Sequence, residues 1–235
     1  MIPLTRRGFG IGAVSLASGS PALVEPSLRL PPTDKPTVAL TLDACPGAFD
    51  ERLARFLTDN SIAATIFLTS LWIRRNPAGL AFLLEHRDLF SLQNHGDRHL
   101  PAILGTRPIY GLKPAGSLDA IRNEVALGSD SIIAASGNAP KWYRGAAALY
   151  SSEALPAIRQ MGFGIAGFSL NADAGASLSA VSTAARIAKA RAGDVIIGHI
   201  NQPFRPSGAG IAAGVVALKS QGMAFAWLPS VPYDS

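Results

Sequence analysis

From residue 37 to the C-terminus, short apolar runs alternate with longer segments in which apolar residues recur every three or four positions. Short apolar runs between turn signals are typical of buried strands, and the longer period is typical of amphipathic helices. Strands are predicted at residues 38–42, 64–68, 90–93, 142–144, 164–168, 195–199 and 223–227. Helices are predicted at residues 50–59, 77–86, 117–135, 152–161, 177–192 and 208–220. The alternation predicts an α/β fold of βα units with a mostly parallel sheet, and seven strands suggest a barrel that lacks one unit.

The region before residue 37 is predicted to be a targeting segment and a linker. Arg6 and Arg7 precede a mildly apolar run with an Ala-x-Ala-like end, as in a bacterial twin-arginine signal peptide. Residues 23–36 contain four prolines, which predicts a connector without a regular helix or a central strand. We therefore expect a signal peptide at 1–22, a Pro-rich connector at 23–36 and one domain at 37–235, exported to the periplasm or the cell exterior.

Composition excludes several classes of function. The formal charge is +5, and loss of Arg6 and Arg7 with the signal would leave a mature chain near +3. Lysines and arginines are scattered rather than clustered, so no nucleic-acid partner is expected. No apolar stretch is long enough to span a bilayer in the mature protein. Cys45 is the only cysteine, which excludes an internal disulfide. We expect a monomer.

Ionisable residues follow several predicted strands at the point where each strand ends. In a β/α barrel the carboxyl ends of the strands converge on one face, so these residues are expected to share one pocket. They are Asp43, His95, His99, Arg144, Asp173 and His199.

Two of the four histidines, His95 and His99, lie four residues apart just after a predicted strand. Gly96 and Pro101 favour a loop for this segment, and two imidazoles at that spacing can bind one cation. The sequence therefore predicts a metal site, with a pair of unconnected surface histidines as the alternative.

Five stretches together resemble the polysaccharide deacetylase family, also called carbohydrate esterase family 4, over residues 37–227. They are Thr-Leu-Asp-Ala-Cys-Pro (41–46), His-Gly-Asp-Arg-His-Leu-Pro (95–101), Tyr-Arg-Gly-Ala-Ala (143–147), Asn-Ala-Asp (171–173) and Gly-Asp-Val-Ile-Ile-Gly-His (193–199). The resemblance implies a distorted (β/α) barrel of about seven units. It also implies metal-assisted hydrolysis of N-acetyl groups on a polysaccharide of the envelope or the cell exterior.

The resemblance also implies a role for each site residue. His95 and His99 would bind a divalent metal, expected to be zinc. Asp43 would act as the general base, with Arg144 holding its carboxylate in position. His199 would protonate the leaving amine.

Asp173, the loosest of the motif matches, would orient the ring of His199 and raise its pKa.

The first motif departs from the family pattern, because Ala44 stands where the family has its metal-binding aspartate. The third ligand could then be Asp43 or Cys45. We prefer Asp43, because a carboxylate with two histidines is a familiar catalytic zinc set and Cys45 could equally be a small buried hydrophobe. A metal bond would limit Asp43 as a base, and Asp97 is a weaker alternative for that role.

Two other functions remain open. The loss of the position-44 carboxylate and of the prolines in the third motif would also suit a non-catalytic, glycan-binding relative. The same scaffold could instead hydrolyse another C–N bond or an ester, since the fold and a metal do not fix the substrate.

Overall fold

A computed structural model of the chain describes residues 22–233, so the predicted twin-arginine motif lies outside the described residues. The strands are β1 (Leu23–Val24), β2 (Thr37–Ala44), β3 (Ala64–Leu68), β4 (Phe90–Asn94), β5 (Trp142–Tyr143), β6 (Tyr150–Ser151), β7 (Gly164–Ile165), β8 (Leu170–Asn171), β9 (Val195–His199) and β10 (Ala224–Ala226). The helices are α1 (Glu51–Asp59), α2 (Ser70–Arg75), α3 (Pro77–Glu85), α4 (Leu118–Ser136), α5 (Ala154–Gln160), α6 (Ala180–Ile187) and α7 (Ser207–Ser220), with a short 3-10 turn at Ala146–Ala148.

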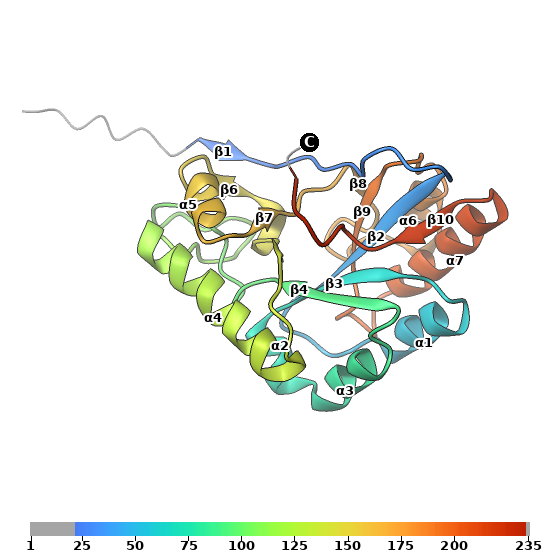
Figure 1. Ribbon diagram of the computed structural model, residues 1–235, viewed down its shortest axis with the longest axis horizontal. Helices are drawn as coiled ribbons and strands as arrows, with labels where there is room; N and C mark the ends of the chain where they lie inside the picture. The colour runs from blue at the N-terminus through green and yellow to red at the C-terminus, as the bar shows by residue number, and fades with distance from the viewer. Residues whose placement is uncertain (1–21, 234–235) are drawn as a thin grey trace, which may run out of the picture.

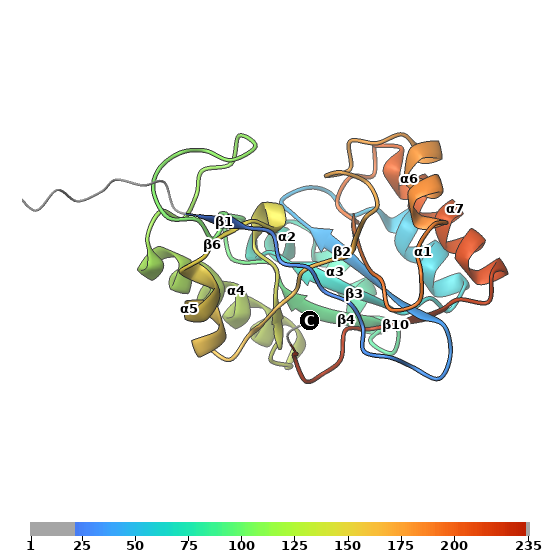
Figure 2. The same cartoon turned by 90° about the horizontal axis from the view of Figure 1, so that it is seen from above.

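The main sheet is parallel and curled. Its strand order is β7-β5-β4-β3-β2-β9-β8, and β10 pairs with the first residues of β2. Helices α1 to α7 form an arc along the outside of the curl (Figures 1 and 2). The two edge strands, β7 and β8, do not pair with each other. The predicted barrel of about seven units is confirmed as a barrel that remains open at this seam.

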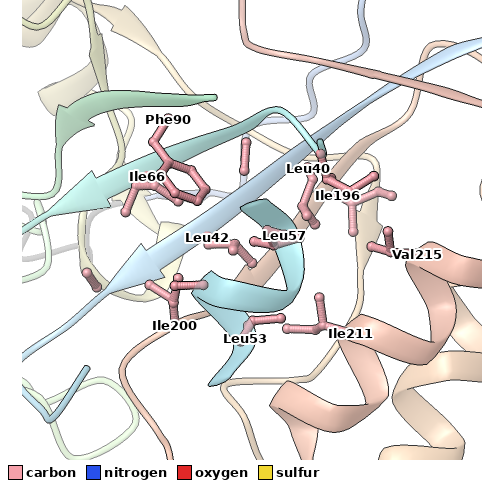
Figure 3. Packing of buried hydrophobic residues seen from close by; sticks show 14 of the residues in the cluster. Leu40, Leu42, Leu53, Leu57, Ile66, Phe90, Ile196, Ile200, Ile211 and Val215 are labelled. Carbon is pink, nitrogen blue, oxygen red and sulfur yellow. The ribbon is translucent and has the colours of Figure 1, made fainter. Parts of the chain in front are cut away.

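Side chains along β2 alternate between the hydrophobic core on one face and the candidate site on the other. Leu40 and Leu42 point toward the helices, where they pack with Leu53 of α1 and Ile211 of α7 (Figure 3). Full burial of each such side chain is worth about 1.5–3 kcal/mol. Because successive side chains of a strand alternate between its faces, Asp43 points to the opposite, inner face of the curl.

The strand register brings inner-face residues of distant segments together. Asp43 pairs with Phe67 of β3 on one side and with His199 of β9 on the other. Parallel strands end at the same edge, so the carboxyl-terminal residues of β2 and β9 form one cluster. The backbone hydrogen bonds between β2 and β9, rather than side-chain interactions, therefore place Asp43 next to His199.

The Pro-rich connector runs along the open seam (Figure 1). It contains only β1, which pairs antiparallel with β6, and an isolated bridge from Arg29 to Asp194. Leu28 is buried with Phe67 and Trp142, on the inner side of the sheet. The connector therefore contributes buried side chains to the barrel interior, which its proline content did not predict.

Several elements differ from the predicted ranges. The six-residue helix α2 and the two-residue strand β8 were not predicted, because such short elements show no measurable periodicity. Helix α6 spans Ala180–Ile187 rather than 177–192, because the Ser179 side chain accepts the N–H of Ser182 and starts the helix there. Among residues 22–233, no helix is both long and apolar enough to cross a membrane.

Candidate active and metal site

All six predicted site residues lie near the carboxyl ends of the strands. Asp43 ends the inner face of β2, Arg144 follows β5, and His199 ends β9. His95 and His99 lie on the loop after β4, with ring centroids 4.9 Å apart.

The carboxylate of Asp43 is paired with a buried guanidinium. Arg144 Nη1 donates to Asp43 Oδ1 at 2.9 Å, and both side chains are almost fully buried. Burial alone would raise the pKa of Asp43, but the positive charge of Arg144 and the neighbouring His95 and His199 outweigh it and lower this pKa. Asp43 is therefore an ionised carboxylate at neutral pH.

Arg144 is fixed on every side. Its Nε donates to the carbonyl of Ala166 and its Nη2 to the carbonyl of Gly167, and its guanidinium lies 4.3 Å from the ring centroid of Phe67. A guanidinium held by two carbonyls and an aromatic face has little freedom to move. Arg144 thus sets the position of the Asp43 carboxylate.

His95 is oriented by a backbone carbonyl. Its Nδ1–H donates to the carbonyl oxygen of Arg144 at 2.6 Å, so the lone pair of the neutral ring is on Nε2. Nε2 lies 3.4 Å from Cys45 Sγ and 3.9 Å from Asp43 Oδ2. This is the arrangement in which a metal-binding histidine is held by its second nitrogen.

Cys45 lies close to both histidines. Among the described residues, Cys45, His95 and His99 have ligand atoms that all lie within 4.8 Å of one another. Burial would raise the pKa of the Cys45 thiol, but His95 and hydrogen bonds from the surrounding histidines lower it well below its usual value. Asp43, the expected third ligand, is not in this grouping; its Oδ2 lies 3.9 Å from His95 Nε2, and Arg144 holds its Oδ1.

Ala44 lies away from the cluster. Its side chain is fully buried in the apolar layer under the helices, the side of β2 opposite to Asp43. Cys45 follows at the next inward position.

Asp173 fixes the ring of His199. Strand β8 pairs with β9 so that Asn171 lies opposite Ile197, which brings Asp173 beside His199. His199 Nδ1 lies 3.0 Å from Asp173 Oδ1, where the ring N–H donates to the carboxylate. Burial would lower the pKa of His199, but the hydrogen bonds to Asp173 and Cys45 raise it well above its usual value.

The alternative base, Asp97, lies outside this cluster of contacts. Its carboxylate is 3.6 Å from Arg74 Nη1 on helix α2.

Glu124 of α4 supports the histidine loop and was not predicted. Its buried carboxylate accepts the N–H groups of Arg98 and Leu100 on either side of His99. Gly96 has a φ of +90°, and a Cβ there would lie 2.5 Å from Glu124 Oε1. The sequence did indicate that Glu124 is buried, since it shares a helix face with apolar residues three and four positions away.

Glu124→Ala is expected to lower the free energy of unfolding by about 1–3 kcal/mol, because two backbone N–H groups of the histidine loop lose their acceptor. Urea denaturation measures this change. Glu124→Gln keeps an acceptor oxygen and should lose less, and Asp119→Ala, in an exposed pair on the same helix, should change little. Equal losses in Glu124→Ala and Asp119→Ala would contradict the supporting role of Glu124.

The family model of polysaccharide deacetylase matches residues 31–166 of the chain. No match was found among curated proteins.

Solved structures share the fold at low sequence identity. The peptidoglycan N-acetylglucosamine deacetylase Bc1960 has a TM-score of 0.71 at 22% identity, over 90% of this chain and 94% of that one. A family 4 carbohydrate esterase from Streptomyces lividans, in complex with acetate, has a TM-score of 0.66 at 17% identity, over 86% and 100% of the two chains. BA3943 from Bacillus anthracis, a CE4 family pseudoenzyme, has a TM-score of 0.66 at 21% identity, over 88% and 67%.

Proposed function

The chain belongs to the polysaccharide deacetylase family, and on that premise we propose that it is a metal-dependent hydrolase that removes N-acetyl groups from a polysaccharide of the envelope or the cell exterior. One observation carries this proposal. A fixed carboxylate (Asp43), a pair of histidines (His95 and His99) and a carboxylate-bound histidine (His199) meet at the carboxyl ends of the strands. The arrangement supplies a base, metal ligands and an acid in one cluster.

The ligand atoms fit a divalent cation, for which we propose zinc. Two imidazoles and a thiol whose ligand atoms lie within 4.8 Å of one another are a donor set typical of zinc sites. A cation held there would polarise the acetyl carbonyl and activate a water molecule as nucleophile.

Asp43 is the general base of this proposal. Arg144 occupies Oδ1, and Oδ2 lies on the side of His95. The carboxylate accepts the proton of the attacking water, and Arg144 prevents it from rotating away.

His199 is the general acid. Asp173 holds Nδ1–H, so the proton for the departing amine is carried by Nε2. An amine is a poor leaving group until it is protonated, and a positioned acid contributes about 10²–10⁴-fold to such a step.

The proposal is tested by release of acetate from chitin oligosaccharides and peptidoglycan fragments by the zinc-loaded protein. We expect acetate to appear together with an equal amount of free amine. His199→Ala should keep its zinc and lose turnover by about 10²–10⁴-fold. Acetate released only from O-acetylated glycans would favour an esterase, and a folded, zinc-loaded protein that releases none would favour a non-catalytic glycan-binding relative.

The non-catalytic alternative has one specific observation in its favour. The pseudoenzyme BA3943 has the same fold, and a mutant of it is described as having restored enzymatic activity. In this chain, Ala44 departs from the first motif of the family. Retention of Asp43 with its partner Arg144, and of His199 with its partner Asp173, favours activity.

We also propose that the protein acts as a monomer after export. Residues 1–22 have the pattern of a twin-arginine signal. N-terminal sequencing of protein recovered from the periplasm or medium tests the export, and cleavage near Ala22 is the expected result.

A further inference from the structure

We infer that the thiolate of Cys45 is the third protein ligand of the metal site, and that the site therefore takes a thiophilic cation such as Zn²⁺ or Co²⁺ in preference to Mg²⁺ or Mn²⁺. This rests on the proposed function only for the statement that His95 and His99 bind metal. It leaves Asp43 free of the metal and available as the base.

The separation of the donor atoms matches a tetrahedral site. With Zn–S of about 2.3 Å and Zn–N of about 2.0 Å, tetrahedral geometry places sulfur and nitrogen ligands about 3.5 Å apart. Cys45 Sγ lies 3.4 Å from His95 Nε2. All three donor atoms lie within 4.8 Å of one another, so a small shift of His99 would bring all three to distances from which they can bind one ion.

The hydrogen bonds of His95 point its free lone pair at this position. Because Nδ1–H is held by the carbonyl of Arg144, Nε2 faces Cys45. A ring fixed through its other nitrogen is the usual outer support of a metal-binding histidine.

Asp43 is less suited to bind the metal than Cys45, because one of its two oxygens is already held by Arg144. Arg144 holds Oδ1 at 2.9 Å and is itself fixed by two backbone carbonyls. A metal bond to the remaining oxygen of Asp43 would place a second cation on a carboxylate that is already in a buried ion pair.

Strand geometry explains why a ligand at position 45 can replace the one that the family has at position 44. Asp43 points inward and Ala44 points outward into the apolar layer, so the next inward side chain is that of Cys45. A thiolate there supplies the negative charge that Ala44 does not. Soft sulfur ligands select zinc-like ions, whereas carboxylates and water suit magnesium and manganese.

The test is the absorption spectrum of the protein loaded with Co²⁺ in place of Zn²⁺. A cobalt–thiolate bond gives an intense near-ultraviolet charge-transfer band, which oxygen and nitrogen ligands do not give. We expect about one equivalent of Co²⁺ and this band in the wild-type protein. The band is measured on wild type, so the result does not depend on the folding of a variant.

Variants separate the ligands. Cys45→Ser should lose the band and weaken metal binding by at least the roughly 10–100-fold that loss of an outer-shell partner costs. Asp43→Asn should keep both the band and the stoichiometry. His95→Ala should lose the metal.

The outcomes distinguish this inference from the proposed function. Binding of one Co²⁺ that His95→Ala abolishes, without a charge-transfer band, overturns the role of Cys45 and leaves the deacetylase proposal standing. A clear band in a protein that releases no acetate supports the ligand set and overturns the deacetylase. A folded wild-type protein that binds no Co²⁺ or Zn²⁺ overturns both.

Discussion

Asp43→Asn is expected to lower the turnover number for deacetylation by about 10²–10⁴-fold, because the amide cannot take a proton from water. The Asn oxygen can still accept the hydrogen bond of Arg144, so the geometry of the pocket should change little. Acetate release measures turnover, and metal analysis of the same sample should show an unchanged zinc content.

Asp97→Asn is the matched control, since it makes the same change in a carboxylate that pairs with Arg74 outside the cluster. Turnover of this variant should remain near that of wild type. If Asp97→Asn abolishes turnover and Asp43→Asn does not, the base has been misassigned. If Asp43→Asn instead loses its zinc, Asp43 is a ligand.

Arg144→Met is expected to lower the free energy of unfolding by about 3–5 kcal/mol, because it leaves the buried carboxylate of Asp43 without its partner. The carbonyls of Ala166 and Gly167 also lose their donors. Urea denaturation of the metal-free protein measures the change without a contribution from bound metal.

The exposed pair of Arg55 and Glu51 offers a matched control on helix α1. Arg55→Met should cost at most about 1 kcal/mol, as is usual for surface ion pairs. A double-mutant cycle with Asp43→Asn should show strong coupling to Arg144→Met. A loss below 1 kcal/mol in Arg144→Met would argue that water enters the site and solvates Asp43.

The sequence determined the elements of the core. Apolar runs located β3 at Ala64–Leu68 and placed β9 at Val195–His199, because a buried strand requires an apolar side chain at nearly every position. The predicted helices at 50–59 and 117–135 match α1 and α4 to within one residue, and the structure shows Asp50 and Ser117 capping their first turns. Short elements such as α2 and β8 leave no such pattern.

The sequence also predicted which polar residues share the carboxyl-terminal edge of the sheet. Asp43 and His199 each end a predicted parallel strand, and all parallel strands end at the same edge of the sheet. Their common edge therefore follows from the predicted parallel strands, as does that of Arg144 after β5, whereas the pairing of Asp43 with His199 depends on the observed order of β2 beside β9.

Only the tertiary structure decided what each polar atom contacts. Which oxygen of Asp43 remains available depends on Arg144, which lies 101 positions away in the chain and occupies Oδ1. The support of the histidine loop by Glu124 depends equally on how α4 packs against β4. Hydrophobic periodicity predicts the direction in which each side chain points. A hydrogen bond between distant segments depends instead on separations of tenths of an ångström, and these are set only when the whole sheet and its helices have packed.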